Sequence, residues 1–560
     1  MSEAAQEFHF SPRPNRASEI TWQAWSHEAF DAARQTRRPI LLSISAVWCH
    51  WCHVMDETTY SHPSVIELIN RDFVPIRVDN DVRPDINQRY NMGGWPTTAF
   101  LTPQGDVLTG ATYLPPEQMA DALGKVASYY RTNKPEVVAR VLEGRRRAGA
   151  AVAASSGSLD PGLADRVLGS VETAYDPEHG GFGTAPKFPQ TDAIALLAEQ
   201  SILRGEPRLM EMARHTLAQM AGGGTYDHVE GGFFRYSTTP DWSVPHFEKM
   251  LEDHGGLLAA LALTGQGEIL DDAARYLDTV LRDPDTGLYA GSQDADEEYY
   301  RRDAGGRRQL TPPYVDRRVY AAWNCGLAIA YLDADARLGR PELRARAAAL
   351  LERLFSDLSA PEAGLGHTAG VGGQLGDQAW GLWAAARAAA AGLGGAWRER
   401  ALALAGHLEA AYGDPELGGY FDHAGGDRLG RLEERLKPLT ENSIAAIALA
   451  ELDALVADPE LGLRYRARRA LESVAALPPR YGIMAAVFAR ALDRVRREPV
   501  KVTTVDAGLA RTALAAYPYA VIERSGDGAA VLCVGTACLA PTRRAEELTE
   551  ALQQAVATRG

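Results

Sequence analysis

Two cysteines three residues apart carry the first chemical signal in this sequence. They stand in the run Trp48-Cys49-His50-Trp51-Cys52-His53. The pattern Cys-x-x-Cys-His describes covalent haem attachment, its side chains could also ligate a metal ion, and Cys-x-x-Cys can form a reversible disulfide. Haem attachment needs export and an axial-ligand context, and no second Cys/His cluster lies nearby in the sequence to complete a tetrahedral metal site. Two buried cysteines in a helix are the purely structural alternative. We favour a redox dithiol that needs no metal or other cofactor.

The residues before the pair predict a change from strand to helix. The apolar run PILLSISAVW is typical of a buried strand, and it leads directly into the cysteines. Cys49 would then begin the next helix, where the helix dipole and free N–H groups stabilise a thiolate. A protonated His50 next to it would favour the thiolate further. We therefore expect Cys49 to attack a disulfide and Cys52 to resolve the mixed disulfide.

A proline later in the chain supports the redox interpretation. Pro96 lies in Gly93-Gly94-Trp95-Pro96-Thr97, after the strand-like run FVPIRVD and directly before another strand-like run. In thioredoxin-like folds a cis-proline before this strand packs against the dithiol and offers backbone hydrogen bonds to a bound chain. The expected apolar rim of the site is Trp48, Trp51 and Trp95. Typical thioredoxins carry a buried Asp on the strand before the motif, whereas this chain has Ser43, and we expect a more oxidising pair.

Polar side chains gather in two later segments. The candidate ligand-binding residues are Asp227, His228, Arg235, Trp242, His246, Glu248 and Lys249 in the first segment, and Asp294 and Asp296 in the second. A glycosidase needs one protonated and one ionised carboxyl group, and an epimerase needs two proton-transfer groups, often histidines. His228 with His246, or Asp296 with Glu248, could fill these roles. Alternatively, Asp and His beside Gly-Gly turns cap helices and bond turn backbones.

The elements that must position these residues fall into three zones. Residues 1–150 interleave helices and strands, which indicates an α/β domain. Residues 158–496 show about twelve helical patterns, one of them over 246–264, and an Asp-to-Gly-Gly-aromatic turn recurs roughly every 50 residues. Six helical hairpins predict an all-α, closed (α/α)6 toroid with its Gly-Gly loops at one rim. Residues 499–560 predict a small α/β appendage.

Composition bounds the class of protein. The chain has 560 residues, 46% of them hydrophobic and 23% charged, as expected for several globular domains. Its net charge of −15 argues against nucleic acid or an anionic membrane as a partner. No apolar run approaches the length of a membrane span, and the N-terminus lacks a signal-peptide pattern. Five cysteines fit a reducing compartment, so we expect a cytoplasmic protein.

Long segments resemble one protein family. They include AVWCHWCHVM, GGWPTTAFLTPQG, GGFGTAPKFPQ, YDHVEGGFFRYSTTPDWSVPHFEKMLEDH, SQDADEE, AAWNCGLAIA and AVLCVGTACLAP. Together they are similar, in the same order, to the thioredoxin-domain family of bacterial YyaL and spermatogenesis-associated protein 20. The resemblance implies a thioredoxin-like domain followed by a barrel of the six-hairpin glycosidase and sugar-epimerase type. The chain departs from that family in the Arg-rich segment after Asp296 and at Thr440-Glu441-Asn442-Ser443.

Three functions follow as alternatives. The favoured one is a thiol–disulfide oxidoreductase module fused to a ligand-binding toroid. The second is a sugar-processing barrel with the dithiol as redox sensor, and the third is a non-enzymatic adaptor that binds clients. The expected partner is thus a thiol or disulfide client, or a small molecule such as a sugar. Among the other cysteines, Cys325 is expected in the core. Cys533 and Cys538 could form a second redox pair, although we favour a core role for them.

Overall fold

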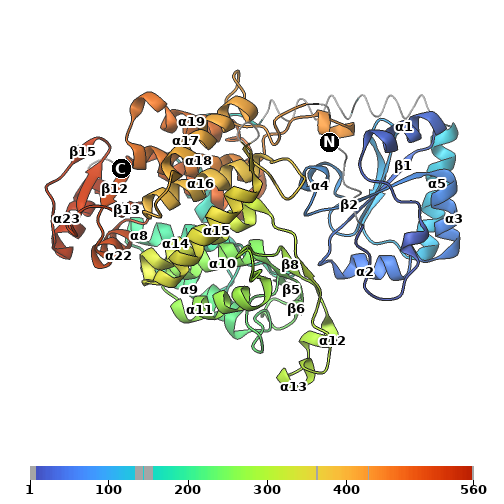
Figure 1. Cartoon of the computed structure of the whole chain (residues 1–560), viewed down its shortest axis with the longest axis horizontal. Helices are drawn as coiled ribbons and strands as arrows, with labels where there is room; N and C mark the ends of the chain where they lie inside the picture. The colour runs from blue at the N-terminus through green and yellow to red at the C-terminus, as the bar shows by residue number, and fades with distance from the viewer. Residues whose placement is uncertain (1–7, 133–142, 144–154, 361–363, 427, 558–560) are drawn as a thin grey trace. The chain divides into compact units, whose positions relative to one another are not determined.

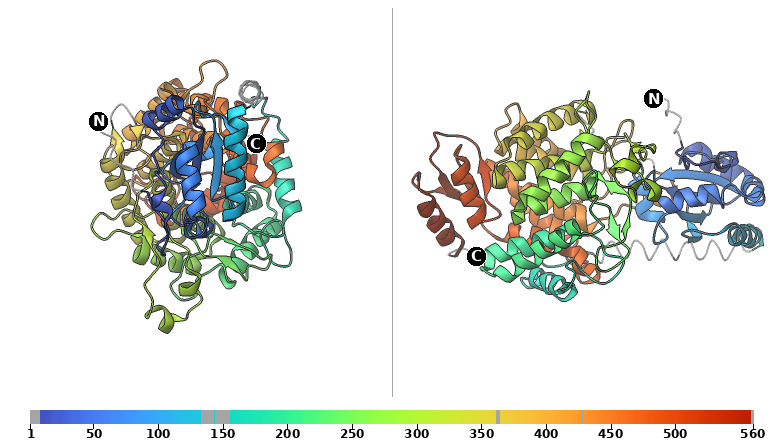
Figure 2. Two further views of the ribbon diagram at one scale, coloured as in Figure 1. Left: turned by 90° about the vertical axis from the view of Figure 1, so that its right-hand side faces the viewer. Right: turned by 90° about the horizontal axis from the view of Figure 1, so that it is seen from below.

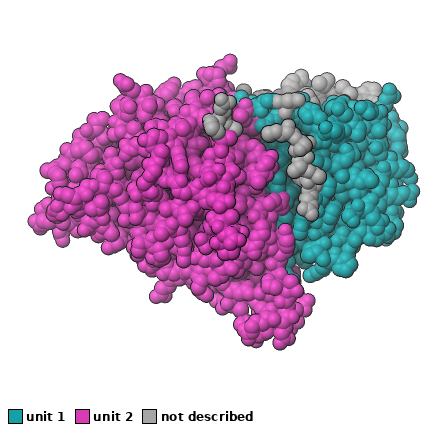
Figure 3. All heavy atoms as spheres, in the orientation of Figure 1, with its two compact units in different colours: residues 1–153, 294–296, 425–436 teal, residues 154–293, 297–424, 437–560 magenta. Residues whose placement is uncertain are grey.

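The computed structural model describes residues 8–132, 143, 155–360, 364–426 and 428–557. The chain forms two compact units, coloured separately in Figure 3. Unit 1 contains residues 1–153 together with two short later segments, 294–296 and 425–436. Unit 2 contains the rest, including the C-terminal segment. The predicted boundary at residue 150 lies outside the described residues, and the other domain boundaries stay predictions.

Unit 1 has a thioredoxin-like α/β fold, as predicted (Figure 1). Its sheet has the order β2-β1-β3-β4. The strands are β1 (Ile40–Ser45), β2 (Val74–Asp79), β3 (Thr97–Leu101) and β4 (Val107–Ala111). β1 runs parallel to β2 and antiparallel to β3, and β4 is antiparallel to β3. The helices are α1 (His27–Thr36), α2 (His50–Glu57), α3 (Pro63–Asp72), α4 (Pro84–Tyr90) and α5 (Pro116–Thr132).

Strand β1 is buried on both faces, because helices cover the sheet on both sides. Its alternate side chains Ile40, Leu42 and Ile44 belong to one apolar cluster, with residues of α1 and α4. Leu41 points the other way, into a cluster with residues of α3 and α5. The sequence run PILLSIS therefore has apolar side chains on both faces, apart from Ser43 and Ser45, because both faces of this strand are buried.

A short segment from far along the chain completes the first of these clusters. Leu432, in the 3-10 turn η4 (Gly430–Glu433), is buried with the α1 and α4 residues. The Tyr90 hydroxyl accepts a hydrogen bond from the Arg431 N–H and donates one to the Gly105 carbonyl, both at 2.7 Å. Arg89 donates to the backbone carbonyls of Arg431 and Glu434. Residues 425–436 are thus a structural part of unit 1, which the sequence pattern did not predict.

Unit 2 is the predicted (α/α)6 toroid (Figures 1 and 2). Six inner helices contact one another in a closed ring, in the order α8, α10, α14, α16, α18, α21 and back to α8. Their bounds are α8 Thr191–Arg204, α10 Leu251–Thr264, α14 Ala321–Leu338, α16 Leu375–Ala390, α18 Leu439–Val456 and α21 Ala486–Arg496. The outer helices are α9 Pro207–Gly222, α11 Gly267–Tyr276, α15 Pro341–Leu358, α17 Trp397–His407, α19 Leu463–Glu472 and α7 Leu163–Ala174. Each outer helix packs mainly on one inner helix.

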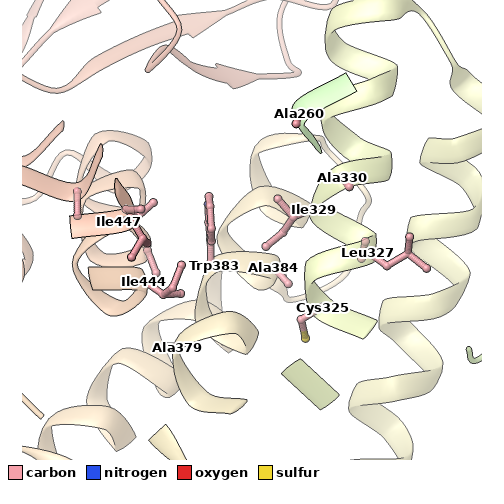
Figure 4. Packing of buried hydrophobic residues seen from close by; sticks show 14 of the residues in the cluster. Ala260, Cys325, Leu327, Ile329, Ala330, Ala379, Trp383, Ala384, Ile444 and Ile447 are labelled. Carbon is pink, nitrogen blue, oxygen red and sulfur yellow. The ribbon is translucent and has the colours of Figure 1, made fainter. Parts of the chain in front are cut away.

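The inner helices are apolar on most of their surface. α18 buries a run of residues from Asn442 to Leu452, and its neighbours are similarly rich in Ala and Leu. Figure 4 shows Trp383 of α16 packed between side chains of α18 and α14, including Ile447 and Ile329. The free Cys325 of α14 is fully buried there, which confirms its predicted core role. A helix that is apolar all round fits a position between two layers.

One predicted helix begins later than expected. Residues 246–264 were expected to be helical throughout, but α10 starts at Leu251. The residues before it form two short strands, β6 (Pro245–His246) and β7 (Lys249–Met250). β6 pairs with β5 (Tyr236–Ser237). β7 pairs with β8 (Ser292–Gln293), which in turn pairs with β9 (Val315–Asp316). These tertiary pairings override the helical pattern of the sequence.

The recurring turns share one internal brace. In three of them a buried lysine donates to the turn's Asp carboxylate and to a glycine carbonyl two residues before the aromatic residue. The three sets are Lys187 with Asp176 and Gly180, Lys249 with Asp227 and Gly231, and Lys437 with Asp414 and Gly418. The Asp carboxylate also accepts the N–H groups two and three residues on. Each brace therefore neutralises one buried lysine and fixes one loop.

The C-terminal segment is a small α/β layer in the same unit. It comprises β12 (Val500–Thr503), α22 (Ala507–Ala516), β13 (Val521–Glu523), β14 (Val531–Val534), β15 (Ala537–Cys538) and α23 (Ala545–Ala557). The predicted strands and both predicted helices are confirmed. Its sheet has the order β13-β12-β14-β15, with only β12 and β13 parallel. α22 packs against α14, and β13 packs against α16 and α18, so the layer rests on the inner ring.

Replacing Lys437 with Met should lower the free energy of unfolding of unit 2 by about 3 kcal/mol, because the Asp414 carboxylate and the Gly418 carbonyl lose their buried partner. Urea denaturation followed by circular dichroism measures this. The control is Arg353→Met, which removes an exposed ion pair with Asp357 and should cost no more than about 0.5 kcal/mol. Equal effects of the two substitutions would contradict a bracing role for Lys437.

Candidate functional site

The cysteine pair lies where β1 passes into α2. Cys49 is the N-cap of α2, with extended backbone, and its Sγ accepts a hydrogen bond from the Cys52 N–H at 3.1 Å. The two cysteines are bonded as a disulfide, with Cα atoms 5.2 Å apart. When the bond is reduced, the same N–H and the helix dipole stabilise a thiolate on Cys49. The position that the sequence predicted for this residue is therefore the one observed.

Pro96 stands next to the same end of the sheet. The Trp95–Pro96 peptide bond is cis. Thr97, the first residue of β3, is paired with Ile44 of β1, so Pro96 borders the end of β1 from which the cysteine loop departs. The loop before it is held by Asn91, whose Oδ1 accepts the N–H groups of Gly93 and Gly94. The chain order of cysteine pair, β2, cis-proline and β3 matches the arrangement expected of a thioredoxin-like site.

The tryptophans form only part of the expected rim. Trp48 is buried, and its Nε1 donates to the Asp81 carboxylate at 2.7 Å. Its ring meets that of Trp95 edge to face, with centroids 5.6 Å apart. Trp51 is 48% exposed and lies beside the Tyr113 ring. Trp48 and Trp95 thus support the cysteine loop, and Trp51 is the tryptophan that can meet an incoming chain.

A histidine that the sequence analysis passed over lies directly after the pair. His53 is buried, and burial, with smaller contributions from His9 and His50, lowers its pKa to about 3. The ring is therefore neutral at neutral pH. Its Nδ1 lies 3.6 Å from the carboxylate of Asp294, in the short segment 294–296 of unit 1, so this approach is not an ion pair. A neutral imidazole beside the dithiol can donate or accept a hydrogen bond without bringing charge into the site.

A buried ion pair also links helix α2 to strand β2. Asp56, one turn after Cys52, receives both guanidinium N–H groups of Arg77 at 2.9 Å and the Ser11 N–H. Burial raises the pKa of Asp56 despite Arg77. Arg77 lies on β2 opposite Ser43, the position where thioredoxins carry their buried Asp. This chain thus keeps a buried carboxylate near the dithiol, but on the helix rather than on the strand.

The candidate residues of the barrel separate into groups. Asp227 and Lys249 form one of the three buried braces, which Arg307 joins at 2.7 Å from Asp227. Burial opposes ionisation of Asp227, but Lys249 and Arg307 outweigh it and hold its pKa at about 2. Trp242 is fully buried and donates through Nε1 to the His179 carbonyl. These placements favour roles in loop structure and packing for Asp227, Lys249 and Trp242.

The structure does not bring all of the remaining candidate ligand-binding residues together. His246 Nδ1 lies 2.7 Å from the buried Glu248 carboxylate, and its ring stacks on Tyr236. His228 is exposed on its turn and contacts the Gly223 carbonyl. Asp294 and Asp296 belong to unit 1, not to unit 2 with the other candidates. Their expected pairing with barrel residues stays a prediction.

Three further carboxyl groups lie at inner-helix N-termini. Glu252 and Asp253 lie in the first turn of α10, and Glu441 lies in the first turn of α18. Burial and neighbouring carboxylates together raise the pKa of Asp253 and of Glu441 to about 7 each. The Glu252 carboxylate is one of these neighbours for both residues. Oδ2 of Asp253 is buried without a hydrogen-bond partner.

The charge balance of this cluster is unusual for a barrel end. Arg235, half-buried, is the cation that opposes the raised pKa of Asp253 and Glu252. Near neutral pH, Asp253 and Glu441 are each partly protonated, so the cluster offers both an acid and a base. These residues lie one or two residues inside an observed inner helix, and that position becomes meaningful only once the ring is known.

Comparison with known proteins supports the assignment of unit 1. Residues 13–144 match the Thioredox_DsbH family. Its description reads "Protein of unknown function, DUF255". The chain is 35% identical over 311 residues to human spermatogenesis-associated protein 20, and 34% identical over 310 residues to the rat protein. Each match covers 50% of this chain but only 39% of the relative, so the chain spans less than half the length of these relatives. The resemblance noted in the sequence is confirmed.

Solved structures resemble the chain in fold. They include a sugar epimerase from a ruminal bacterium, with 14% identity, a TM-score of 0.45 and coverage of 56% of this chain and 84% of that one. D-mannose isomerase has 11% identity, a TM-score of 0.44 and coverage of 71% and 98%. A DsbH oxidoreductase has 18% identity, a TM-score of 0.19 and coverage of 22% and 96%. With TM-scores below 0.5, these likenesses carry no conclusion about activity.

Two further observations concern other classes of function. Among the described residues, no three His, Cys, Asp or Glu side chains gather in a way that could hold a metal ion. Within the same residues, no helix combines the length and apolar character needed to cross a bilayer.

His53 should make unit 1 acid-sensitive. The unfolded chain binds a proton on this ring near pH 6.5, whereas the folded chain binds it only near pH 3. Between these values the unfolded state holds more protons, so stability falls as the pH is lowered, by up to about 1.4 kcal/mol per pH unit. Hydrogen exchange of β1 peptides between pH 4 and 7 measures this slope. His53→Gln should flatten it, and substitution of the exposed His62 by Gln should not.

Proposed function

We propose that this protein is a thiol–disulfide oxidoreductase whose active centre is the Cys49–Cys52 pair. The observation that carries the proposal is the disulfide at the N-terminus of α2, next to the cis peptide bond of Pro96. A cysteine pair with a structural role alone needs neither a helix N-terminus nor a neighbouring cis-proline. The match of residues 13–144 to a thioredoxin-like family supports the same assignment.

The reaction follows from the two environments. In the reduced protein the Cys49 thiolate attacks a client disulfide, which gives a mixed disulfide and one client thiolate. Cys52, buried behind it, then attacks Cys49 Sγ as a thiolate, which forms the Cys49–Cys52 bond and releases the second client thiolate. The client gains two electrons and the protein loses two. Pro96 would hold the incoming chain, and His50 would favour the thiolate of Cys49 when protonated.

The pair should be more oxidising than a thioredoxin pair. The strand position of the usual buried Asp is occupied by Ser43, and the adjacent His53 is neutral. Neither residue places a negative charge beside the leaving thiolate, so the reduced form is less destabilised than in a thioredoxin.

Redox titration of the purified chain, followed by alkylation and mass spectrometry, tests this function. We expect a reversible two-electron couple above about −270 mV, the thioredoxin value, and a pKa for Cys49 below the usual 8.5. Cys49→Ser should abolish disulfide reductase activity, and Cys52→Ser should trap the mixed disulfide. His246→Ala, in unit 2, serves as the matched control and should leave the couple unchanged. A pair that neither cycles nor ionises below pH 8 would overturn the proposal.

A second function, acid–base catalysis on a small polar ligand such as a sugar, is favoured by the barrel carboxyl cluster. Asp253 and Glu441 have pKa values near 7 on two different inner helices. One can be protonated while the other is ionised, which is the pairing that glycoside hydrolysis and sugar isomerisation use. This function does not depend on the dithiol.

Infrared titration of the carboxyl C=O band measures this protonation state without a known substrate. Between pH 6 and 8 we expect loss of a band that Asp253→Asn and Glu441→Gln each diminish. In a screen of sugars for epimerisation or hydrolysis, the same substitutions should reduce any turnover at least about 100-fold. The control Asp357→Asn alters an exposed carboxylate and should change neither readout. Turnover that survives both substitutions, or that disappears with Cys49→Ser, would contradict a catalytic role for the cluster.

A further inference from the structure

The C-terminal sheet carries a second disulfide. Cys533 of β14 and Cys538 of β15 are directly opposite in the antiparallel ladder and are bonded, with Cα atoms 4.0 Å apart. The next pair along, Leu532 with Leu539, makes the ladder hydrogen bond. Cys533 and Cys538 are therefore a non-hydrogen-bonded pair, in which side chains lie closest. The favoured prediction of a core role does not hold for Cys538, which is exposed on the edge strand.

The two sulfurs have different surroundings. Cys538 lies on the last strand of the sheet, and Leu539 after it is 49% exposed. Cys533 is only 8% exposed, one strand further in. An attacking thiolate can therefore reach Cys538 more readily than Cys533. Attack on one sulfur of a disulfide expels the other, so Cys533 is the thiolate that leaves.

A lysine lies on the inner side of the leaving cysteine. Lys501 of β12 is the ladder partner of Cys533 on the side away from Cys538, and directly opposite residues share one face of a sheet. Its ammonium group lies 3.1 Å from the Glu523 carboxylate and donates to the Leu455 carbonyl of α18. The ladder register puts Lys501 on the face that carries the disulfide, while these contacts direct its ammonium group toward β13 and α18. A neighbouring ammonium group lowers the pKa of a thiol and makes it a better leaving group.

The disulfide is poorly placed for a purely structural role. The apolar core of this layer contains Val500, Val502, Leu532 and Val534, which alternate with Lys501 and Cys533 along the same strands. The cysteines thus occupy the other face, outside that core. The bond also closes a loop of only a few residues, for which the stabilisation from loop closure is smallest. Neither packing nor chain entropy accounts well for a cystine at this position.

We propose that Cys533–Cys538 is a second thiol–disulfide exchange site, which takes its electrons from a dithiol. One thiolate of the dithiol attacks Cys538 Sγ, the Cys538–Cys533 bond breaks, and Cys533 leaves as a thiolate beside Lys501. The second thiol of the dithiol, after losing its proton to solvent, attacks its partner sulfur in the mixed disulfide and expels Cys538 as a thiolate. The dithiol ends as a disulfide, and the pair has gained two electrons. The proposal does not depend on the function of Cys49–Cys52.

The experiment uses the full-length chain with Cys49→Ser and Cys52→Ser, so that one disulfide remains. Opening by dithiothreitol under native conditions is followed by alkylation and mass spectrometry of the peptide with residues 533 and 538, while circular dichroism confirms that the fold is retained. We expect a rate proportional to the dithiothreitol concentration. Opening at a rate independent of that concentration, as for access only after unfolding, would overturn the proposal.

Three substitutions test the assigned roles. Lys501→Met should slow opening about three- to tenfold, because the leaving thiol has a higher pKa, and Lys501→Arg should restore the rate to within about twofold. In the single-cysteine variants, Cys538 of Cys533→Ser should react with oxidised glutathione at least tenfold faster than Cys533 of Cys538→Ser. An unchanged rate in Lys501→Met, or the reverse order of reactivity, would overturn the assignment of Cys533 as the leaving group.

A final experiment distinguishes between possible sources of the dithiol. The oxidised Cys49→Ser/Cys52→Ser chain is mixed with a reduced chain that carries Cys533→Ser and Cys538→Ser. Transfer of electrons between them identifies the Cys49–Cys52 dithiol as a donor. If only dithiothreitol opens the Cys533–Cys538 pair, small dithiols are the donors instead. Either result supports an exchange site. If neither reductant opens the pair in the folded chain, the proposal fails, whatever the redox behaviour of Cys49–Cys52.

Discussion

Closing six inner helices into one ring determines where the polar side chains of the barrel can lie. The walls of each inner helix are covered by its neighbours and by an outer helix, so nearly every position along it must be apolar. Many polar groups lie at the helix ends and in the loops between hairpins, and others, such as Arg490 with Glu199, pair between inner helices. The groups at the ends and in the loops include braces such as Lys249 with Asp227, whose charges cancel, and the carboxyl groups of Asp253 and Glu441, whose charges do not. The first kind costs little to bury because it is paired, and the second is tolerated by taking up protons.

In the thioredoxin-like unit, the environment of the two cysteines is determined by the backbone at the start of α2. There the strand-to-helix turn leaves free N–H groups at the start of α2, and the Cys49 sulfur satisfies one of them. Next to the dithiol, His53 is neutral, and the charge of the Asp56 carboxylate is balanced by Arg77. These features favour a stabilised thiolate at Cys49. They do not provide a carboxylate on the strand that could hold a proton for Cys52. That is why the chemistry of the site follows from its backbone more than from its neighbouring side chains.

Sequence patterns predicted the elements well and the long-range placements poorly. The Cys49–Cys52 motif, Pro96 and the hairpin period each depend on residues close in sequence, and the turn at β1, the cis peptide bond and the closed ring were all found. By contrast, the packing of Leu432 against α1 and α4 joins parts of the chain roughly 400 residues apart, and no local pattern encodes it. Trp242 and Asp227 were singled out because they are polar or aromatic beside glycines. Residues of the same types also brace loops, so residue type alone could not distinguish a ligand-binding role from a structural one.

The two α/β layers of the chain use the same sheet for different thiol chemistry. Both have a parallel pair at one edge, followed by two strands that each run antiparallel to the strand before, in the orders β2-β1-β3-β4 and β13-β12-β14-β15. In the first layer the cysteines follow the central strand β1 and borrow the positive end of a helix. In the second they lie on β14 and the edge strand β15, where no helix begins and the only backbone donors belong to the ladder. A thiolate on Cys533 must therefore draw its stabilisation from a side chain, and the ladder register provides Lys501 at the adjacent position. The two proposals thus assign different sources of stabilisation to a sulfur anion on a shared sheet topology, the backbone in one layer and a lysine in the other.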